Sequence, residues 1–282
     1  LIYGERLVTC MLVVSATLEI YPLQDAILPP FTSKVTRTAF ASLWGETPST
    51  GRLGFFSVLF REGKPLYKRL ERLGSKNILT ARTGEKLEAK ISLLAKEEPP
   101  LPEDSTNFTF ASTEFHAKIT SLEVTRLGEL KIDLPRKFTI KFLTPTLLPV
   151  PGRGELLKEK GIKRRYKLLP DLPLALRLLT YDLKLRKIDL VKATPFQLYK
   201  WTYRALAELD YHVHPETVLY TVREDKPSIE RGFTGFILYE LIDNTSPLKQ
   251  ELEKLLAFAL KFGIGKSRNI GFGHITLQKV EA

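Results

Sequence analysis

The sequence predicts an α+β protein of two tandem domains, each with the same order of strands and helices. The first observation is length, because 282 residues are too many for one small core and suit two of ordinary size. The second is that apolar residues alternate in some stretches and recur at helical spacing in others. The third is that a fresh strand begins near Arg136. We therefore expect an N-terminal domain over 1–132 and a C-terminal domain over 133–282.

The first half should hold a strand, a helix and several further strands. The apolar run within 7–23 indicates a strand covered on both faces, because the polar residues inside it argue against a signal peptide. Helical spacing of apolar residues predicts a helix over 34–44, with Ser33 as its N-cap. Alternating patterns predict further strands in these ranges: 53–60, 77–94 and 106–124. A second helix and a last strand would complete this half.

The second half repeats that order. Strands are expected at 138–142, 213–222, 229–241 and 274–280, and helices at 171–187 and 195–209. The clearest helix is 247–262, whose apolar residues gather on one side and whose charged residues gather on the other. The order strand, helix, strand, strand, helix, strand is the ferredoxin-like βαββαβ pattern, which RNA-recognition domains share.

Charge favours a polyanionic partner. Lys and Arg outnumber Asp and Glu by 43 to 32, which gives a net charge of +11. Between residues 151 and 200 the surplus of basic residues is eight. Lys163, Arg164 and Arg165, with Tyr166 beside them, have the basic and aromatic character of a groove for an RNA backbone. The alternative is a solvated basic loop.

Cysteine usage indicates the compartment. The single cysteine, Cys10, cannot form an internal disulfide, so we expect a reducing cytoplasm. One Met and one Cys beside many charged residues also point to a thermophilic source. No membrane association is expected.

A glycine-rich loop at 263–273 carries the main functional signal. Gly263, Gly265, Gly271 and Gly273 free the backbone to let phosphates approach N–H groups, while Lys266, Ser267 and Arg268 supply a basic centre. A Walker A loop would open a helix, and a dinucleotide loop would run from a strand into a helix, so neither fits. The sequence thus predicts a loop that binds phosphates, and the alternative is an ordinary connection from a helix to a strand.

The loop resembles the signature loop of the RAMP superfamily, since glycine–hydrophobic–glycine stands at both of its ends. The segment Arg231-Gly232-Phe233-Thr234-Gly235-Phe236 resembles the glycine-phenylalanine strand of CRISPR repeat-processing endoribonucleases, and 142–146 resembles the strand end that opens their second half. Residues 21–35 resemble the first strand and helix of the crenarchaeal branch of that family, so the resemblance spans most of the chain.

This resemblance implies a function. The family cleaves the repeats of CRISPR precursor RNA without metal or cofactor. The ribose 2′-hydroxyl attacks the adjacent phosphate and leaves a 2′,3′-cyclic phosphate and a 5′-hydroxyl. An archaeal source, CRISPR repeat RNA as partner and association with a CRISPR effector complex are also implied, and a homodimer is left open.

The catalytic residues depart from the family pattern. Many members carry a histidine on or just after the first helix, whereas the histidines here are His116, His212, His214 and His274. We therefore expect basic side chains to act: Lys34 as acid or base, and Arg37, Arg52 and Arg268 as phosphate stabilisers. Arg37 follows Lys34 by three residues and so shares its helical face. Arg231 and the glycine-rich loop are expected to bind the RNA.

Two other functions stay open. One is a non-catalytic RAMP subunit that binds guide RNA in an interference complex, and the other is a ferredoxin-like enzyme that binds a phosphorylated metabolite in the glycine-rich loop. A metal at His212 and His214, which share one strand face, is disfavoured because no further Cys or His lies nearby. His274 is expected at the surface beside the RNA path.

Overall fold

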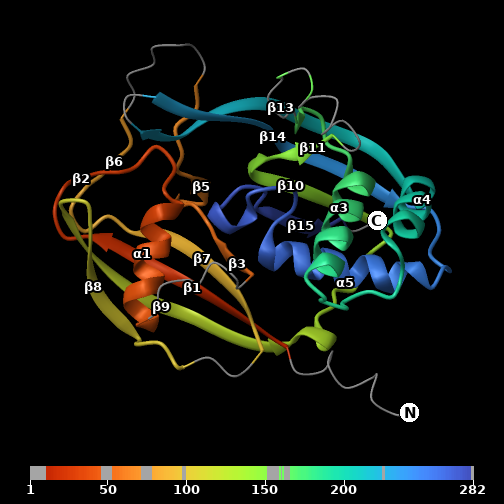
Figure 1. The fold of residues 1–282 in the computed structure, drawn as a ribbon, viewed down its shortest axis with the longest axis horizontal. Helices are drawn as coiled ribbons and strands as arrows, with labels where there is room; N and C mark the ends of the chain where they lie inside the picture. Colours follow the sequence, from red (N-terminus) through yellow and green to blue (C-terminus); the bar gives the residue numbers. More distant parts are fainter. Residues whose placement is uncertain are drawn as a thin grey trace. The chain divides into compact units, whose positions relative to one another are not determined.

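The computed structural model describes most of the chain, namely residues 11–45, 53–70, 78–96, 100–150, 159, 161, 166–223 and 226–280. Contacts divide the chain into two compact units (Figure 1). The first unit comprises Leu1–Leu130, Val218–Ile229 and Arg268–Gly271, and the second comprises Lys131–Thr217, Glu230–Ser267 and Phe272–Ala282. The boundary near residue 132 stays a prediction, and two later segments group with the first unit.

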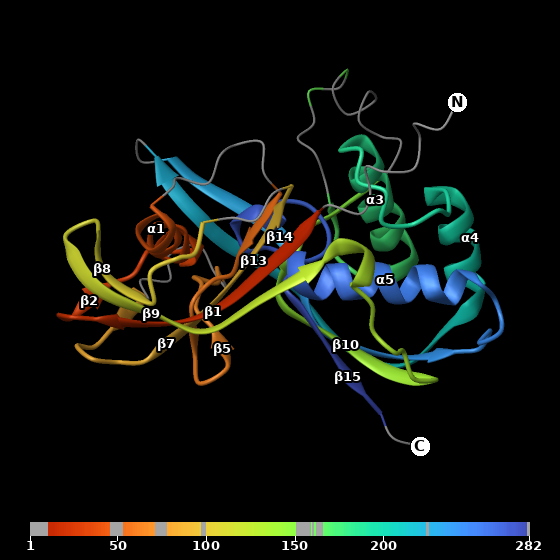
Figure 2. The same cartoon turned by 90° about the horizontal axis from the view of Figure 1, so that it is seen from below.

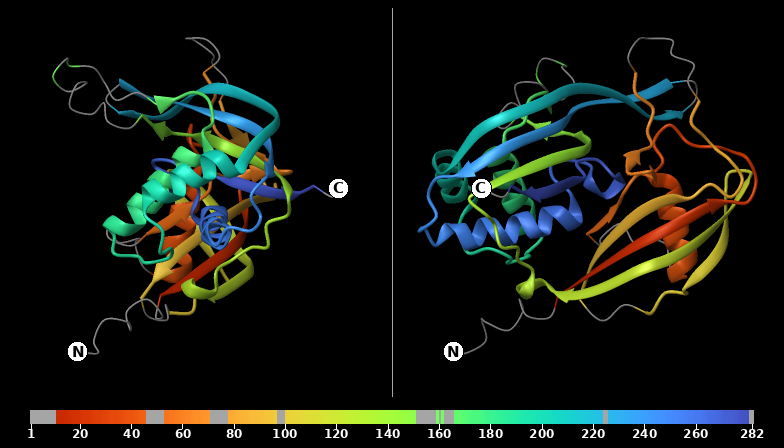
Figure 3. Two further views of the ribbon diagram at one scale, coloured as in Figure 1. Left: turned by 90° about the vertical axis from the view of Figure 1, so that its right-hand side faces the viewer. Right: turned by 180° about the vertical axis from the view of Figure 1, so that it is seen from behind.

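The first unit is built on a seven-stranded antiparallel sheet. Its strands are β1 (Leu12–Pro22), β3 (Gly54–Phe56), β4 (Phe60–Arg61), β5 (Lys64–Pro65), β7 (Leu87–Ala95), β8 (Ser105–Phe110) and β9 (Thr113–Arg126). The central strand β1 pairs with β7 on one side and with β9 on the other (Figure 3, right). The order β9, β1, β7 and then β3 with β4 is that of a ferredoxin-like sheet, whose first strand lies between the third and the fourth.

Helix α1 (Ser33–Trp44) covers one face of this sheet (Figure 1). Val35, Ala39 and Leu43 recur at helical spacing and are buried in one cluster with Leu18 and Ile20 of β1. Burial along β1 alternates, since residues 15, 17, 19 and 21 are only half-buried. The expectation that this strand is covered on both faces was therefore wrong, because its second face carries polar side chains.

The first half also differs from the expected pattern in its connections. Among the described residues between β7 and β9, β8 forms a hairpin with β9 in place of the expected second helix. The turn of this hairpin includes Ala111, which has a positive φ of 53° and splits the predicted strand 106–124. The short elements that remain are β2 (Ala26–Ile27), which pairs with β6 (Thr80–Ala81), and the 3₁₀ turn η1 (Leu127–Glu129).

The second unit holds a four-stranded sheet in the order β13, β14, β10, β15. The strands are β10 (Lys137–Thr146), β13 (Leu206–Arg223), β14 (Lys226–Leu241) and β15 (Ile275–Lys279). The first strand again lies between the third and the fourth, so both sheets share one topology. A two-stranded pair of β11 (Leu148–Pro149) and β12 (Tyr166–Lys167) lies off this sheet.

The helices of the second unit lie on one face of its sheet (Figure 2). They are α3 (Leu172–Leu185), α4 (Pro195–Ala205) and α5 (Leu248–Phe262), and α5 packs against the other two and against β15. The prediction of a helix over 247–262 is confirmed, with Pro247 at the N-cap position. Helix α4 begins with a capping box of Thr194 and Gln197 and ends at Ala205, because β13 starts with the next residue.

The described chain is therefore α+β with two ferredoxin-like sheets, as the sequence predicts. Within the residues that the structure describes, no helix has the length and apolar character that crossing a membrane requires.

Candidate functional site

The start of α1 is fixed by a buried threonine. The Thr32 hydroxyl donates to the carbonyl of Leu66 at 2.7 Å and accepts from the N–H of Leu59 at 2.8 Å. Thr32 stands at the N-cap position without capping the helix by its side chain, and Ser33 is the first helical residue. The expectation that Ser33 caps the helix was wrong, because its hydroxyl is used elsewhere.

The Ser33 hydroxyl joins α1 to the glycine-rich loop. It donates to the carbonyl of Ile270 at 2.8 Å, which holds the 3₁₀ turn η2 (Arg268–Ile270) against the start of the helix. Gly271 follows with φ of +89°, and a Cβ there would lie 2.8 Å from the carbonyl oxygen of Phe56. Only glycine allows this approach. The loop segment therefore reaches α1 and β3 within the first unit.

Lys34 is held by the end of β13. Its Nζ donates to Thr221 Oγ1 at 3.0 Å and lies 5.4 Å from the centre of the Tyr220 ring. That ring packs edge-on against Phe31 at 5.8 Å. A cation over an aromatic face is attracted to the ring, and the hydroxyl fixes its direction. The ammonium of Lys34 is therefore positioned rather than free to move in solvent.

Two arginines also lie on these elements, Arg37 on α1 and Arg268 on η2. Arg37 lies one turn beyond Lys34 on α1, with its guanidinium 5.7 Å from the centre of the Phe56 ring. Arg268 opens η2 after Ser267, which has a positive φ of 60°, and its side chain is half-buried. Lys34, Arg37 and Arg268 thus come from two elements that the bond between Ser33 and Ile270 joins. We call these three residues the basic cluster.

The glycines of the loop in the second unit serve close packing. The N–H of Gly263 donates to the Ala259 carbonyl at 2.7 Å, and the N–H of Gly273 donates to the Pro145 carbonyl at 3.0 Å. A Cβ on Gly265 would lie 2.7 Å from the carbonyl oxygen of Leu147. In this conformation the N–H groups of Gly263 and Gly273 are used within the protein.

Arg231 and Lys266 flank one short segment of the second unit. A Cβ on Gly232, next to Arg231, would lie 2.6 Å from the carbonyl oxygen of Thr146, and the N–H of Lys266 donates to the Leu147 carbonyl at 2.8 Å. Both basic side chains are exposed. Burial raises the pKa of the neighbouring Glu230, and the positive charge of Lys266 partly offsets that rise.

Four predicted residues lie outside the described part of the chain, namely Arg52, Lys163, Arg164 and Arg165. Their assignments stay predictions.

The structure contradicts the expectation for His274 and agrees with the expected arrangement of His212 and His214 on one strand face. His274 was expected at the surface, but the residue is 2% exposed and its backbone N–H donates to Thr144 Oγ1 at 2.9 Å. The first residues after the loop are buried between α5 and the sheet, which the polar alternation of β15 concealed. His212 and His214 do share one exposed face of β13, with their Nε2 atoms 2.8 Å apart. Among the described residues, no three His, Cys, Asp or Glu side chains gather to hold a metal ion.

Sequence reasoning missed Tyr220 and Thr221. Thr221 lies 187 residues beyond Lys34, and neither residue stands out from the alternation of its strand. No signal in a single sequence connects them to α1, because the contact depends on the path of β13.

Replacing Ser33 by alanine should lower the free energy of unfolding by about 1 kcal/mol, because the Ile270 carbonyl loses its donor. Ser121→Ala, on the exposed part of β9, is the matched control and should change the free energy by less than about 0.5 kcal/mol. Urea unfolding followed by circular dichroism measures both. Equal effects of the two substitutions would show that the bond between Ser33 and Ile270 contributes nothing to stability.

Each cation of the basic cluster can stabilise an anion that binds next to it. Positive groups on α1 and η2 can act on the charge that develops on a phosphate during transfer. A lysine can also exchange a proton with the reacting oxygen, whereas an arginine stays charged. With two ferredoxin-like sheets and a basic cluster, the chain has the features of an RNA-binding enzyme.

Comparison with known proteins agrees with this class. Residues 14–125 match the Cas6 N-terminal domain, and residues 140–275 match the CRISPR-associated endoribonuclease Cas6 family. Two curated relatives, CRISPR-associated endoribonucleases Cas6 1 and Cas6 2 of Saccharolobus solfataricus, are each 28% identical to this chain. The first alignment covers 93% of this chain and 95% of the relative, and the second covers 92% and 93%.

Solved structures share the fold. Cas6 of Thermus thermophilus has a TM-score of 0.57 at 16% identity, over 96% of this chain and 99% of that one. A Cas6-related protein of Pyrococcus furiosus has a TM-score of 0.51 at 14% identity, over 95% and 100%. The chain belongs to the Cas6 family of CRISPR-associated endoribonucleases. The resemblance seen in the sequence, including its crenarchaeal branch, is confirmed.

Proposed function

We propose that this protein cleaves CRISPR precursor RNA within its repeats, without a metal ion, by attack of a ribose 2′-hydroxyl on the adjacent phosphate. The products would be a 2′,3′-cyclic phosphate and a 5′-hydroxyl. Membership of a family of endoribonucleases supports the substrate class. The observation that carries the proposal is the ammonium of Lys34, held by Thr221 and Tyr220.

The reaction needs three kinds of group. A base takes the proton of the 2′-hydroxyl, an acid gives a proton to the leaving 5′-oxygen, and cations stabilise the phosphorane between them. Lys34 is our candidate for acid or base, and Arg37, Arg268 and Arg52 are our candidates for stabilising the phosphorane. We assign RNA binding to Gly263, Gly265, Lys266, Ser267, Arg268, Gly271 and Gly273 of the loop, and to Arg231, Lys163, Arg164 and Arg165.

A second candidate function is that of a non-catalytic RNA-binding subunit of an interference complex. The absence of histidine from α1 favours it, since many relatives use a histidine there. Association with a CRISPR effector complex is compatible with either function, and so is a homodimer.

Incubation of the protein with labelled repeat RNA in EDTA tests the proposal. We expect a single cut, and a copy of the RNA with a 2′-deoxyribose at the cleaved nucleotide should stay intact, because it lacks the attacking hydroxyl. Cleavage of the deoxy copy would contradict the mechanism. Tight binding without a cut, across several repeats, would favour the non-catalytic subunit.

A further inference from the structure

Helix α4 carries three aromatic side chains along one face. Phe196, Tyr199 and Tyr203 stand at positions i, i+3 and i+7, which share one side of a helix. Phe196 is 62% exposed and Tyr203 is 70% exposed, whereas Leu198 and Thr202 are buried, since α4 packs against α3 and α5. We call the rings of Phe196, Tyr199 and Tyr203 the aromatic stripe. Large apolar groups that gather at a surface typically mark an interaction site.

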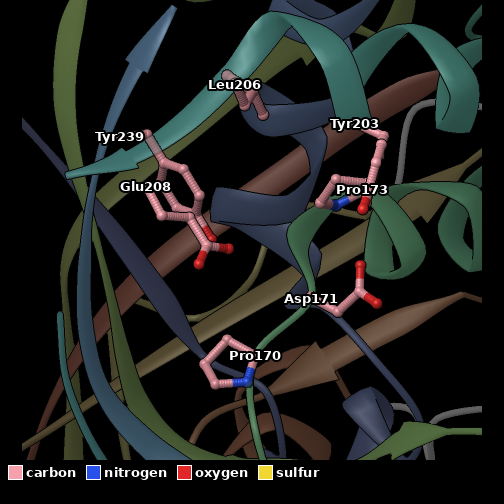
Figure 4. A pocket seen from close by; sticks show the side chains of 7 residues that line it. All are labelled: Pro170, Asp171, Pro173, Tyr203, Leu206, Glu208 and Tyr239. Carbon is pink, nitrogen blue, oxygen red and sulfur yellow. The ribbon is translucent and has the colours of Figure 1, made fainter. Parts of the chain in front are cut away.

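At the C-terminal end of α4 the stripe borders a pocket of about 400 Å³ (Figure 4). Tyr203, whose ring centre lies 6.2 Å from that of Tyr199, forms part of the wall together with Pro173 of α3. Asp171 and Glu208 also line this pocket. Their negative charges disfavour a phosphate there, so the backbone of a polyanion should follow the other side of the stripe.

Positive charges border the stripe on both sides. The guanidinium of Arg177, on α3, lies 5.6 Å from the centre of the Tyr199 ring. Lys200 and Arg204 each follow a tyrosine of the stripe by one residue, so they lie about 100° further round the helix, on the side of the stripe away from the buried face. Both are exposed, and they are the only charged residues of α4. This helix therefore attracts an anion and has no carboxylate of its own to repel it.

This combination of rings and cations fits a single-stranded nucleic acid better than other partners. An unpaired base offers a flat face to a ring, and the phosphates beside it are attracted to Lys200 and Arg204. A duplex keeps its bases stacked in its interior and offers the rings no free base. The core of a protein–protein interface is depleted in charged residues, lysine among them, whereas here cations stand on both sides of the rings. Charge complementarity therefore selects the nucleic acid.

We propose that the aromatic stripe binds an unpaired segment of RNA, with bases stacked on the rings of Phe196 and Tyr203 and phosphates against Lys200 and Arg204. Stacking uses the face of a base and not its hydrogen-bonding edge, so this surface tolerates any sequence. The inference rests on the proposed function for RNA as the ligand. It adds an RNA-binding surface remote in sequence from Lys34 and from the glycine-rich loop.

Fluorescence anisotropy tests the stacking, with a labelled RNA of about 12 nucleotides that forms no secondary structure. The same strand paired to its complement serves as the comparison. Tyr203→Ala should weaken binding of the unpaired strand by at least about fivefold, the loss of one stacked base, and should change binding of the duplex by less than about twofold. Tyr203→Phe keeps the ring and should bind like wild type. Phe196→Ala, at the other end of the stripe, should act in the same direction as Tyr203→Ala.

Arg204→Gln tests the phosphate contact. The affinity for the unpaired strand should fall, and the slope of the logarithm of affinity against the logarithm of salt concentration should become shallower by about 0.7, the effect of one phosphate contact on a single strand. Tyr203→Ala removes no charge, so it should lower the affinity and leave this slope unchanged. An unchanged slope in Arg204→Gln would overturn the contact with the RNA backbone that the proposal requires.

Tyr211→Ala is the matched control, because Tyr211 is 68% exposed on β13 of the same unit and lies outside the stripe. It should leave the affinity for the unpaired strand unchanged. Equal effects of Tyr203→Ala and Tyr211→Ala, or equal losses for unpaired and paired RNA, overturn the proposal. If Tyr203→Ala keeps its RNA affinity but splits a dimer seen by light scattering, the stripe binds a second copy of this chain, which also overturns it. Cleavage of repeat RNA is measured separately, since a protein that binds RNA through the stripe and cuts none would contradict only the proposed function.

Discussion

Lys34→Ala is expected to slow cleavage of repeat RNA by at least about a hundredfold, the effect typical of losing a general acid or base. The substitution removes the ammonium that Thr221 and Tyr220 hold at the start of α1. It leaves the apolar face of the helix intact, because Val35, Ala39 and Leu43 form that face. The loss should therefore fall on the reaction and not on the fold.

Single-turnover cleavage, with protein in excess over RNA, measures the chemical step directly. Lys64→Ala is the matched control, since Lys64 is an exposed lysine on β5 and its loss changes the net charge equally. We expect its rate to stay within about twofold of wild type, because substitutions at exposed sites seldom disturb the structure. If Lys34→Ala and Lys64→Ala slow cleavage equally, general loss of positive charge explains both and Lys34 has no special role.

Lys34→Arg separates proton transfer from electrostatic stabilisation. Arginine keeps the positive charge but does not release its proton under ordinary conditions. If Lys34 is the acid or base, this variant should bind repeat RNA about as well as wild type and cleave it almost as slowly as Lys34→Ala. Recovery of cleavage with arginine would instead make Lys34 an electrostatic stabiliser like Arg37.

The regular elements could be predicted because their patterns are local. Helix α5 follows directly from apolar residues at helical spacing, and its buried residues include Leu252, Leu255 and Leu256, as expected. The burial of only one face of β1 was harder to predict, because hydrophobic residues also occur on its outer side near Leu12. Periodicity predicts where an element lies, while the number of covered faces depends on what packs there.

The site could be predicted only in part, because its contacts join distant parts of the chain. Lys34 and Arg37 are predicted from their spacing on one helix, whereas Thr221, which bonds to Lys34, lies near the far end of β13. The role of Ser33 depends on where η2 lies. The sequence pattern predicts that its hydroxyl caps the helix, whereas it donates to the carbonyl of Ile270. The glycine-rich loop was recognised by its composition, but the N–H groups of Lys266 and Gly273 bond to the distant carbonyls of Leu147 and Pro145, which no local pattern could identify.

Gly273→Ala is expected to lower the free energy of unfolding by at least about 3 kcal/mol. An effect of this size is larger than that of most single substitutions and is typical of severe strain or overlap. Gly273 has a φ of +67°, where alanine is strained by about 1–2 kcal/mol. A Cβ at this position would also lie 1.8 Å from the carbonyl oxygen of Ile264. Ile264 is fully buried, and its N–H donates to the Gly273 carbonyl at 2.9 Å. Neither residue can move without breaking this bond or the core around it.

Gly63→Ala isolates the backbone strain from the overlap. Gly63 has a φ of +73°, close to that of Gly273, but nothing lies within 4 Å of the position that its Cβ would take. Its substitution should therefore cost only the strain, about 1–2 kcal/mol. Urea unfolding of both variants measures the difference, which reports the contact between Gly273 and Ile264. A difference below about 0.5 kcal/mol would mean that the loop accommodates a side chain, because effects of that size are typical of unconstrained sites. A large difference would establish that the loop is rigid where it passes from α5 into β15, so the glycines are required for packing whether or not they also touch RNA.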